Sequence, residues 1–224
     1  MNNMNLYKGD CLEVMKTIES GSIDAIITDP PYKIIQGGCT NKAVRLKGTT
    51  HEDLKNGALF KHNDIKFSDW LNDAFRVLKN GSHCIVMTND RNLEQLLTDS
   101  RKAKFKLLNI LVWKKSKHSP NRYYMKNAEF LVLLRKGSAK NINDMGTRQV
   151  LEFDNVKTKT HPTEKPVELL TKLIENSTNE NEIVLDLFMG TGSTGVAAKN
   201  LNRNFIGIEQ DDKYFEIAKQ RINE

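Results

Sequence analysis

The residues best suited to chemistry form one short run, Asp29-Pro30-Pro31-Tyr32, directly after the apolar strand candidate Ile23–Thr28. Proline fixes φ and donates no backbone N–H, so this turn is stiff and its carbonyl groups point in set directions. A carboxylate and a carbonyl accept hydrogen bonds from an amino group, while Tyr32 offers a ring face. The run therefore predicts a site for a flat partner with an exocyclic amino group, a nucleobase or an amide. The alternative is an ordinary strand exit with a surface tyrosine.

A second run with chemical potential lies near the C-terminus. Gly190-x-Gly192-x-x-Gly195 follows the strand candidate Ile183–Leu187 and opens a helix, and Glu209 comes 19 residues after Gly190. Glycines let a nucleoside approach the backbone, and an acid at that distance can bind ribose hydroxyls. The pattern fits NAD as well as S-adenosylmethionine, so an NAD-dependent oxidoreductase is an alternative of a different class.

The order along the chain favours one of these cofactors. Only 15 residues follow Glu209, enough for one helix, whereas a dinucleotide domain builds onward from its glycine fingerprint. The sheet must therefore be completed by earlier strands, in a circularly permuted order. This places the strand at Leu6-Tyr7 beside the strand that ends at Glu209, and it brings Asp10 to the adenine of the same ligand. Asp10 also suits a helix N-cap.

Three motifs in this order resemble the beta group of the DNA amino-methyltransferases, which methylate exocyclic nitrogens of DNA bases with S-adenosylmethionine. Residues 29–32 resemble their catalytic motif, in the form typical of adenine-N6 enzymes. Asp186-Leu187-Phe188-Met189-Gly190-Thr191-Gly192-Ser193-Thr194 resembles their cofactor motif. His161-Pro162-Thr163-Glu164-Lys165-Pro166 resembles the segment that holds the methionine part, although position 164 is often Gln in the family.

The resemblance implies methyl transfer to N6 of an adenine that has left the duplex, with cytosine N4 as the alternative. Weaker alternatives are an RNA or protein-amide methyltransferase, the NAD-dependent enzyme, and a binding module that has lost catalysis. Asp29 and the Pro30 carbonyl would accept from the amino group, Pro31 would stiffen the turn, and Tyr32 would stack on the base. The cofactor residues expected from the motifs and from chain order are Asp10, Cys11, Thr163, Lys165, Asp186, Phe188, Gly190, Thr191, Gly192 and Glu209.

Hydrophobic runs predict the fold that must position these residues. We expect a single methyltransferase domain over 1–224, a doubly wound α/β Rossmann-like sheet of seven strands with one antiparallel edge strand. Leu107–Trp113 and Ala128–Leu134 should be the antiparallel pair, because no clear helix joins them. We expect a mobile active-site loop at 33–66 and a small target-recognition element at 137–160.

The distribution of charge along the chain predicts the kind of molecule that the protein binds. Residues 101–126 hold nine Lys or Arg and no acidic residue, whereas the whole chain has a net charge of +6. A cluster of one sign with interleaved aromatics favours nucleic acid, here double-stranded DNA, and a solvated face is the alternative. The residues expected at DNA are Lys114, Lys115, Lys117, Arg122, Tyr123 and Tyr124.

Composition excludes other classes. No apolar run approaches the ~18 residues of a membrane span, and the polar N-terminus is no signal peptide. Three scattered cysteines and five histidines give no metal-ligand spacing, so we expect no metal. A reduced cytoplasm suits this cysteine usage. The sequence leaves open a homodimer and a paired restriction enzyme.

Overall fold

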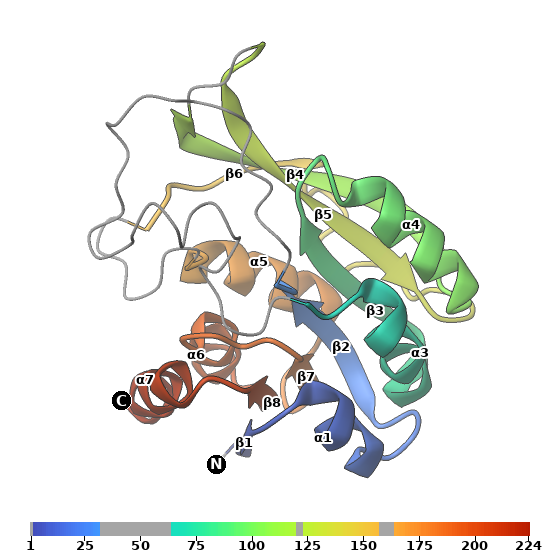
Figure 1. Ribbon diagram of the computed structural model, residues 1–224, viewed down its shortest axis with the longest axis vertical. Coiled ribbons are helices and arrows are strands. Elements are labelled where there is room, and N and C mark those ends of the chain that lie inside the picture. Colours follow the sequence, from blue (N-terminus) through green and yellow to red (C-terminus); the bar gives the residue numbers. More distant parts are fainter. Residues whose placement is uncertain (1, 32–63, 120–122, 157–163) are drawn as a thin grey trace.

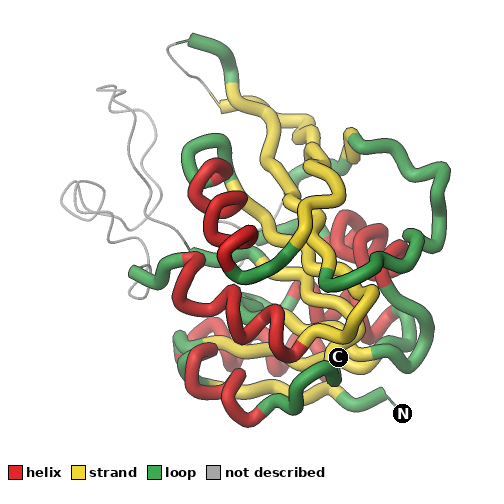
Figure 2. The backbone as a smooth tube through the Cα atoms, turned by 90° about the vertical axis from the view of Figure 1, so that its right-hand side faces the viewer, coloured by secondary structure: helices red, strands yellow, loops and turns green. Residues whose placement is uncertain are grey.

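A single mixed sheet with helices on both faces forms the body of the protein (Figures 1 and 2). The computed structural model describes residues 2–31, 64–119, 123–156 and 164–224. No helix in these ranges is long and apolar enough to cross a membrane.

The strand order across the sheet is β1-β8-β7-β2-β3-β5-β4-β6. The strands are β1 Met4–Lys8, β2 Ile23–Thr28, β3 Leu78–Thr88, β4 Lys106–Ser119, β5 Lys126–Arg135, β6 Val150–Glu152, β7 Ile183–Asp186 and β8 Asn204–Glu209. The helices are α1 Cys11–Thr17, α3 Phe67–Val77, α4 Leu93–Lys102, α5 Val167–Ser177, α6 Ser193–Asn200 and α7 Asp212–Asn223.

The α/β class and the β4–β5 antiparallel pair are confirmed, but two details of the expected sheet are wrong. There are eight strands in the described sheet, because the three-residue β6 pairs in parallel with β4. So short a strand gives no hydrophobic run to recognise. The one strand antiparallel to its neighbours, β5, lies inside the sheet between β3 and β4 and is not at an edge.

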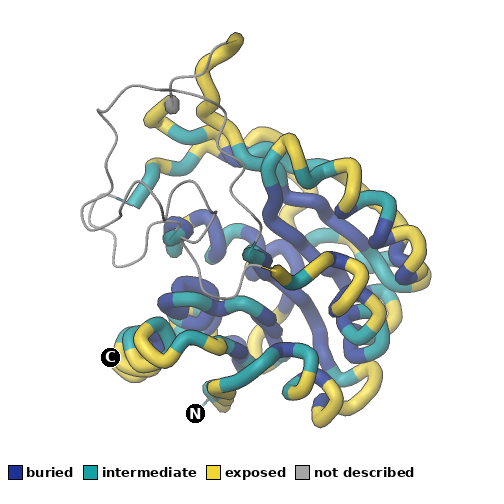
Figure 3. The backbone as a smooth tube through the Cα atoms, viewed as in Figure 1, coloured by how far each residue is buried: buried dark blue, intermediate teal, exposed yellow. Residues whose placement is uncertain are grey.

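Alternation along the central strands builds two cores. In β3, Cys84 and Val86 face a cluster with α1, α3 and α4, while Ile85 and Met87 face a cluster with α5, α6 and α7. Successive side chains of a strand point to opposite faces, so a continuous apolar run is what a sheet covered on both sides requires. The central strands are accordingly the most deeply buried part of the backbone (Figure 3).

Strand order gathers the predicted site at one edge of the sheet. β8 and β7 lie between β1 and β2, and these four strands run parallel. Asp10, Asp29, Asp186 and Glu209 stand at or just after their four carboxyl ends, where ligands of open α/β sheets bind. The expected pairing of β1 with β8 is confirmed, with Lys8 opposite Glu209.

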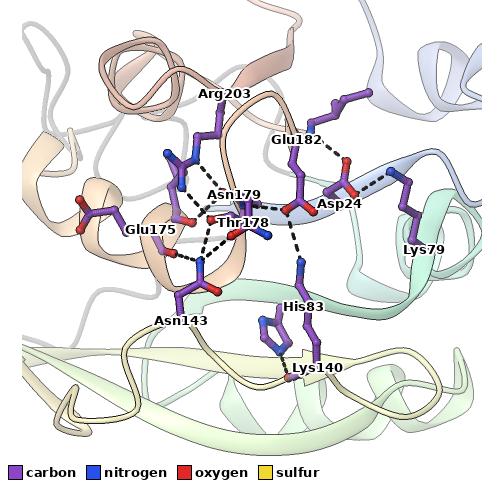
Figure 4. A network of polar contacts seen from close by, with 12 residues as sticks. Asp24, Lys79, His83, Lys140, Asn143, Glu175, Thr178, Asn179, Glu182 and Arg203 are labelled. Atoms are coloured by element: carbon purple, nitrogen blue, oxygen red, sulfur yellow. Dashed lines mark hydrogen bonds and ion pairs between the residues drawn. The ribbon is translucent and has the colours of Figure 1, made fainter.

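A polar network closes the opposite edge, at the amino ends of β2 and β7 (Figure 4). Asp24 there accepts from Lys79 and from the backbone of Ile183, at 2.6 and 2.9 Å. Asn143 donates from its side chain to the carbonyl oxygens of Glu175 and Thr178, at 2.7 and 2.9 Å.

Asn143 belongs to the segment expected to recognise the target, residues 137–160. The network fixes this part of it at the C-terminal end of α5, an 11-residue helix about 16 Å long. Among its described residues, only those around β6 return toward the edge where Asp29 lies, and a recognition role for the segment stays a prediction.

Candidate active site

Asp29 leaves β2 with its two carboxylate oxygens in different environments. Oδ2 accepts from Nζ of Lys165 at 2.5 Å, and Lys165 is 8% exposed. Oδ1 is buried and has no hydrogen-bond partner among the described residues. Burial raises the pKa of Asp29, and the Lys165 ammonium opposes that rise. The carboxylate is thus held by one oxygen and leaves the other available to a donor that enters the site.

Glu129 in β5 is a member of this site that sequence reasoning missed. Its Oε2 lies 3.4 Å from Nζ of Lys165, and its Oε1 accepts from Lys115. Lys115 in turn lies 4.8 Å from the centre of the Trp113 ring. Burial alone would raise the pKa of Glu129, but the two lysines outweigh it and lower that pKa. The only sequence signal was a carboxylate inside an otherwise apolar strand candidate.

The network of Asp29, Lys165, Glu129 and Lys115 therefore alternates in charge and contains two cations and two anions. Lys115, which we expected at DNA, is part of it and is largely buried. Lys165, which the resemblance placed at the methionine end of the cofactor, has its ammonium on the catalytic turn.

The three glycines of the turn have different surroundings: Gly190 is open, whereas Gly192 and Gly195 are closely packed. Gly190 and Gly192 both have positive φ, +53° and +82°, which favours glycine. A Cβ added to Gly190 would meet no atom of the described residues within 4 Å, whereas one on Gly192 would lie 2.9 Å from Cβ of Ala218. A Cβ on Gly195 would collide with Ile222 and Phe205. Only Gly190 fits the expected close approach of a nucleoside, since the other two allow α6 to pack closely.

Asp186 ties neighbouring strand ends together. Its two oxygens accept from the hydroxyls of Thr28 and Thr194, at 2.8 and 2.6 Å, and from the backbone N–H of Phe188 at 3.1 Å. Burial raises the pKa of Asp186 to about 6. The Phe188 ring packs edge-on against Trp70, with centroids 5.8 Å apart. In the described contacts Asp186 orders the turn that leads to Gly190.

Glu209 lies beside the open glycine. Its Oε2 accepts from the backbone N–H of Gly190 at 2.9 Å and its Oε1 from that of Asp211 at 2.8 Å. Burial raises the pKa of Glu209. Each carboxylate oxygen can accept more than one hydrogen bond, so Glu209 retains acceptor capacity for a ribose hydroxyl.

Asp10 is the N-cap of α1, which confirms the prediction from sequence that it suits a helix N-cap. Its side chain accepts from the backbone N–H of Leu12 at 2.9 Å. The preceding residue, Gly9, donates to the backbone carbonyl of Glu209 at 2.9 Å, which holds Asp10 next to the end of β8. Cys11 begins the helix and is buried, and that burial raises the pKa of its thiol to about 12.

Of the remaining predicted site residues, some belong to the described part of the chain and others do not. Pro30 and Pro31 follow Asp29 directly, the first of them buried. Tyr32, Thr163 and Arg122 fall outside the described residues, as does nearly all of the loop expected at 33–66.

The nine cations of residues 101–126 do not form one cluster. Four of them, up to Lys106, flank the start of β4, and Lys117 stands near its end; a 14-residue strand spans roughly 40 Å. Lys114 pairs with Glu152 at 3.1 Å, and Lys126 pairs with Asp90 at 2.6 Å. The acidic partners of Lys114 and Lys126 come from other segments, so the sequence of residues 101–126 does not reveal these two ion pairs.

The β4–β5 hairpin nonetheless projects beyond the body on the side of the catalytic edge (Figures 1 and 3). Tyr123 and Tyr124, expected at DNA, are 84% and 88% exposed beside it, and Met125 is exposed as well. We call residues 114–126, as far as they are described, the hairpin tip. Large exposed aromatic side chains on a projecting element are typical of a binding surface.

Comparison with known proteins agrees with this geometry. Residues 23–220 match the protein family described as DNA methylase. The chain is 31% identical to the Type II methyltransferase M2.MboI of Moraxella bovis, over 99% of this chain and 88% of that protein. It is 32% identical to the Type II methyltransferase M.HinfI of Haemophilus influenzae, over 98% of this chain and 68% of that one.

Solved structures show the same fold. The crystal structure of the M1.HpyAVI–SAM complex matches with a TM-score of 0.73 and 29% identity, over 97% of this chain and 99% of that chain. The PvuII DNA methyltransferase, described as cytosine-N4-specific, matches with a TM-score of 0.76 at 17% identity, over 99% of this chain and 86% of that chain. The NAD-dependent alternative is therefore wrong, and the chain belongs to the DNA methylase family of adenine-N6 and cytosine-N4 amino-methyltransferases.

Proposed function

We propose that this chain transfers a methyl group from S-adenosylmethionine to the exocyclic N6 of adenine in double-stranded DNA. The observation that carries the proposal is the state of Asp29: Lys165 holds one oxygen at 2.5 Å, and the other is buried without a partner among the described residues. Buried polar atoms nearly always have partners, so an orphaned acceptor at a strand end suits an incoming amino group.

Asp29 would orient the attacking nitrogen. Its free Oδ1 and the Pro30 carbonyl accept the two amino hydrogens, which directs the nitrogen lone pair away from them. As the nitrogen becomes cationic during transfer, the adjacent carboxylate stabilises the developing charge without any reorganisation. Tyr32 would stack on the base, a role that rests on the sequence motif.

The open turn at Gly190 fits the cofactor. S-adenosylmethionine supplies the methyl group on a sulfonium sulfur. Glu209 and Asp10 would hold its ribose and adenine beside Gly190, where no atom of the residues that the structure describes fills the space next to the glycine Cα. The segment that contains Lys165 would face its methionine end.

DNA would meet the hairpin tip. Lys114 and Lys117 supply positive charge to the phosphates, and Tyr123 and Tyr124 supply ring faces. The target amino group is paired inside a duplex, so the base must flip out to reach Asp29. A homodimer and a cytoplasmic location stay predictions from the sequence.

Cytosine N4 is the second candidate, because it too is an exocyclic amino group that Asp29 Oδ1 could accept from. The likeness to the cytosine-N4-specific PvuII enzyme shows the fold alone, at 17% identity. Asp in the first motif position favours adenine by resemblance.

One experiment separates the candidates. Unmethylated plasmid DNA is incubated with the protein and S-adenosylmethionine carrying a heavy-isotope methyl group, digested to nucleosides and analysed by mass spectrometry. We expect labelled N6-methyldeoxyadenosine. Labelled N4-methyldeoxycytidine would assign the reaction to cytosine instead. RNA is tested as a parallel substrate, and the absence of label from both DNA nucleosides would contradict the proposal.

A further inference from the structure

Arg221, near the end of α7, joins two segments that are distant in sequence. One guanidinium nitrogen donates to both the backbone carbonyl and the hydroxyl of Thr191, at 2.8 and 2.9 Å. Another lies 2.9 Å from Oε1 of Glu164, whose side chain is only 6% exposed. The planar fork of an arginine suits such divided contacts better than a single ammonium.

The contacts with Arg221 restrain the conformation of the turn at Thr191. Thr191 lies between Gly190 and Gly192, whose φ angles are both positive. Each glycine loses more conformational freedom on ordering than any other residue, so a turn with two glycines is costly to order. Arg221 fixes the peptide between them, and the N–H of Gly190 can then stay on Glu209, the side that faces the proposed cofactor.

Glu164 connects the same arginine to the catalytic turn. Its neighbour Lys165 carries the ammonium that holds Asp29 at 2.5 Å. A buried carboxylate is unfavourable without a cation, and Arg221 supplies one. This accounts for Glu at a position where the resembled family often has Gln: the charge at 164 is matched from the last helix.

Polar contacts thus connect Thr191 to Arg221 and Arg221 to Glu164, and the chain continues from Glu164 to Lys165, which contacts Asp29. We propose that Arg221 is a positioning residue that holds the cofactor turn and the Lys165–Asp29 pair in one geometry. The proposal rests on the proposed function for its effect on the cofactor, but the restraint on the turn is a property of the protein alone.

The test compares three variants. Arg221→Met keeps most of the aliphatic stem and loses all donors. Arg221→Lys keeps the charge near Glu164 but cannot serve both partners. Lys219→Ala removes an exposed cation from the same helix and is the matched control. Circular dichroism first establishes that each variant is folded.

Two measurements follow. Hydrogen exchange of the peptide covering residues 187–195, without cofactor, reports the turn itself. Arg221→Met should exchange at least about tenfold faster than wild type, with Arg221→Lys between them and Lys219→Ala unchanged. Calorimetric titration with S-adenosylmethionine should show a Kd about tenfold weaker for Arg221→Met, since hydrogen bonds to charged groups are lost.

The outcomes are separable. Unchanged exchange in folded Arg221→Met would overturn the positioning role, whatever the cofactor does. Failure of the wild-type protein to bind S-adenosylmethionine would overturn the proposed function. The hydrogen-exchange result would then still test whether Arg221 restrains the turn. Were Arg221→Met unfolded, Arg221→Lys with wild-type exchange and wild-type Kd would still overturn the inference.

Discussion

Replacing Lys165 with Met removes the cation between two largely buried carboxylates while keeping the bulk of its stem. In the wild-type protein its ammonium lies 2.5 Å from Asp29 and 3.4 Å from Glu129. After the change, Lys115 alone remains to oppose the burial of both acids. We expect the pKa of Asp29, already raised by burial, to rise further.

The magnitude follows from the contacts. A hydrogen bond to a charged group contributes about 1.5–3 kcal/mol, which corresponds to a rate of methyl transfer lower by about 10- to 150-fold near neutral pH. Breaking a buried ion pair destabilises a protein by about 3–5 kcal/mol unless the orphaned acid takes up a proton. Since Asp29 stabilises the developing positive charge only when it is ionised, activity should recover as pH rises through its new pKa.

The assay is the pH–rate profile of tritiated methyl incorporation into DNA. The acid limb for Lys165→Met should lie at higher pH than that of wild type. Lys172→Met is the control, because Lys172 pairs with Asp144 outside this network. The double variant Lys165→Met with Glu129→Gln removes one charge of each sign and should be more stable than Lys165→Met alone. A profile for Lys165→Met that superimposes on wild type would refute this role for Lys165.

Two further outcomes follow from the same contacts. Burial raises the pKa of Asp186 from 3.8 to about 6 in the folded protein. Between these two pH values the folded state binds more protons than the unfolded state, so the contribution of Asp186 to the free energy of unfolding falls as pH rises. The difference corresponds to about 3 kcal/mol. Between about pH 4 and about pH 7, the free energy of urea unfolding of Asp186→Asn should therefore shift in favour of pH 7 by about this amount relative to wild type. An equal change with pH in both proteins would contradict the raised pKa of Asp186. At the hairpin tip, replacing Lys114 and Lys117 with Ala should reduce the slope of log affinity for DNA against log salt by about 2, whereas replacing Lys104 and Lys106, at the other end of β4, should leave it unchanged. Equal slopes for the two double variants would mean that the tip does not contact phosphates.

The sequence was sufficient for features that are local or that depend on strand order. The strand before Asp29, the glycine turn and the neighbourhood of β1 and β8 were all predictable, because buried parallel strands read as apolar runs and ligands gather at their carboxyl ends. Asp10 was predictable as a cap from its position before Cys11.

Features that depend on register or distant partners were not predictable. Glu129 comes close to Lys165 because β5 pairs with β3, the neighbour of β2, and Arg221 meets Thr191 only after α7 has packed on α6. The ion pairs of the basic segment were not predictable for the same reason: Glu152 and Asp90, which pair with Lys114 and Lys126, come from other parts of the chain. β6 is three residues long and carries no periodicity to detect.

The most direct test of the central claim is Asp29→Ala, measured by tritiated methyl incorporation into DNA alongside calorimetric titration of S-adenosylmethionine. The substitution removes the acceptor for the amino group and leaves Gly190, Glu209 and Asp10 in place. Methyl transfer should fall below detection while the Kd for the cofactor stays within about threefold of wild type. Transfer at the wild-type rate would show that Asp29 does not align the target nitrogen and would contradict the assignment of the active site.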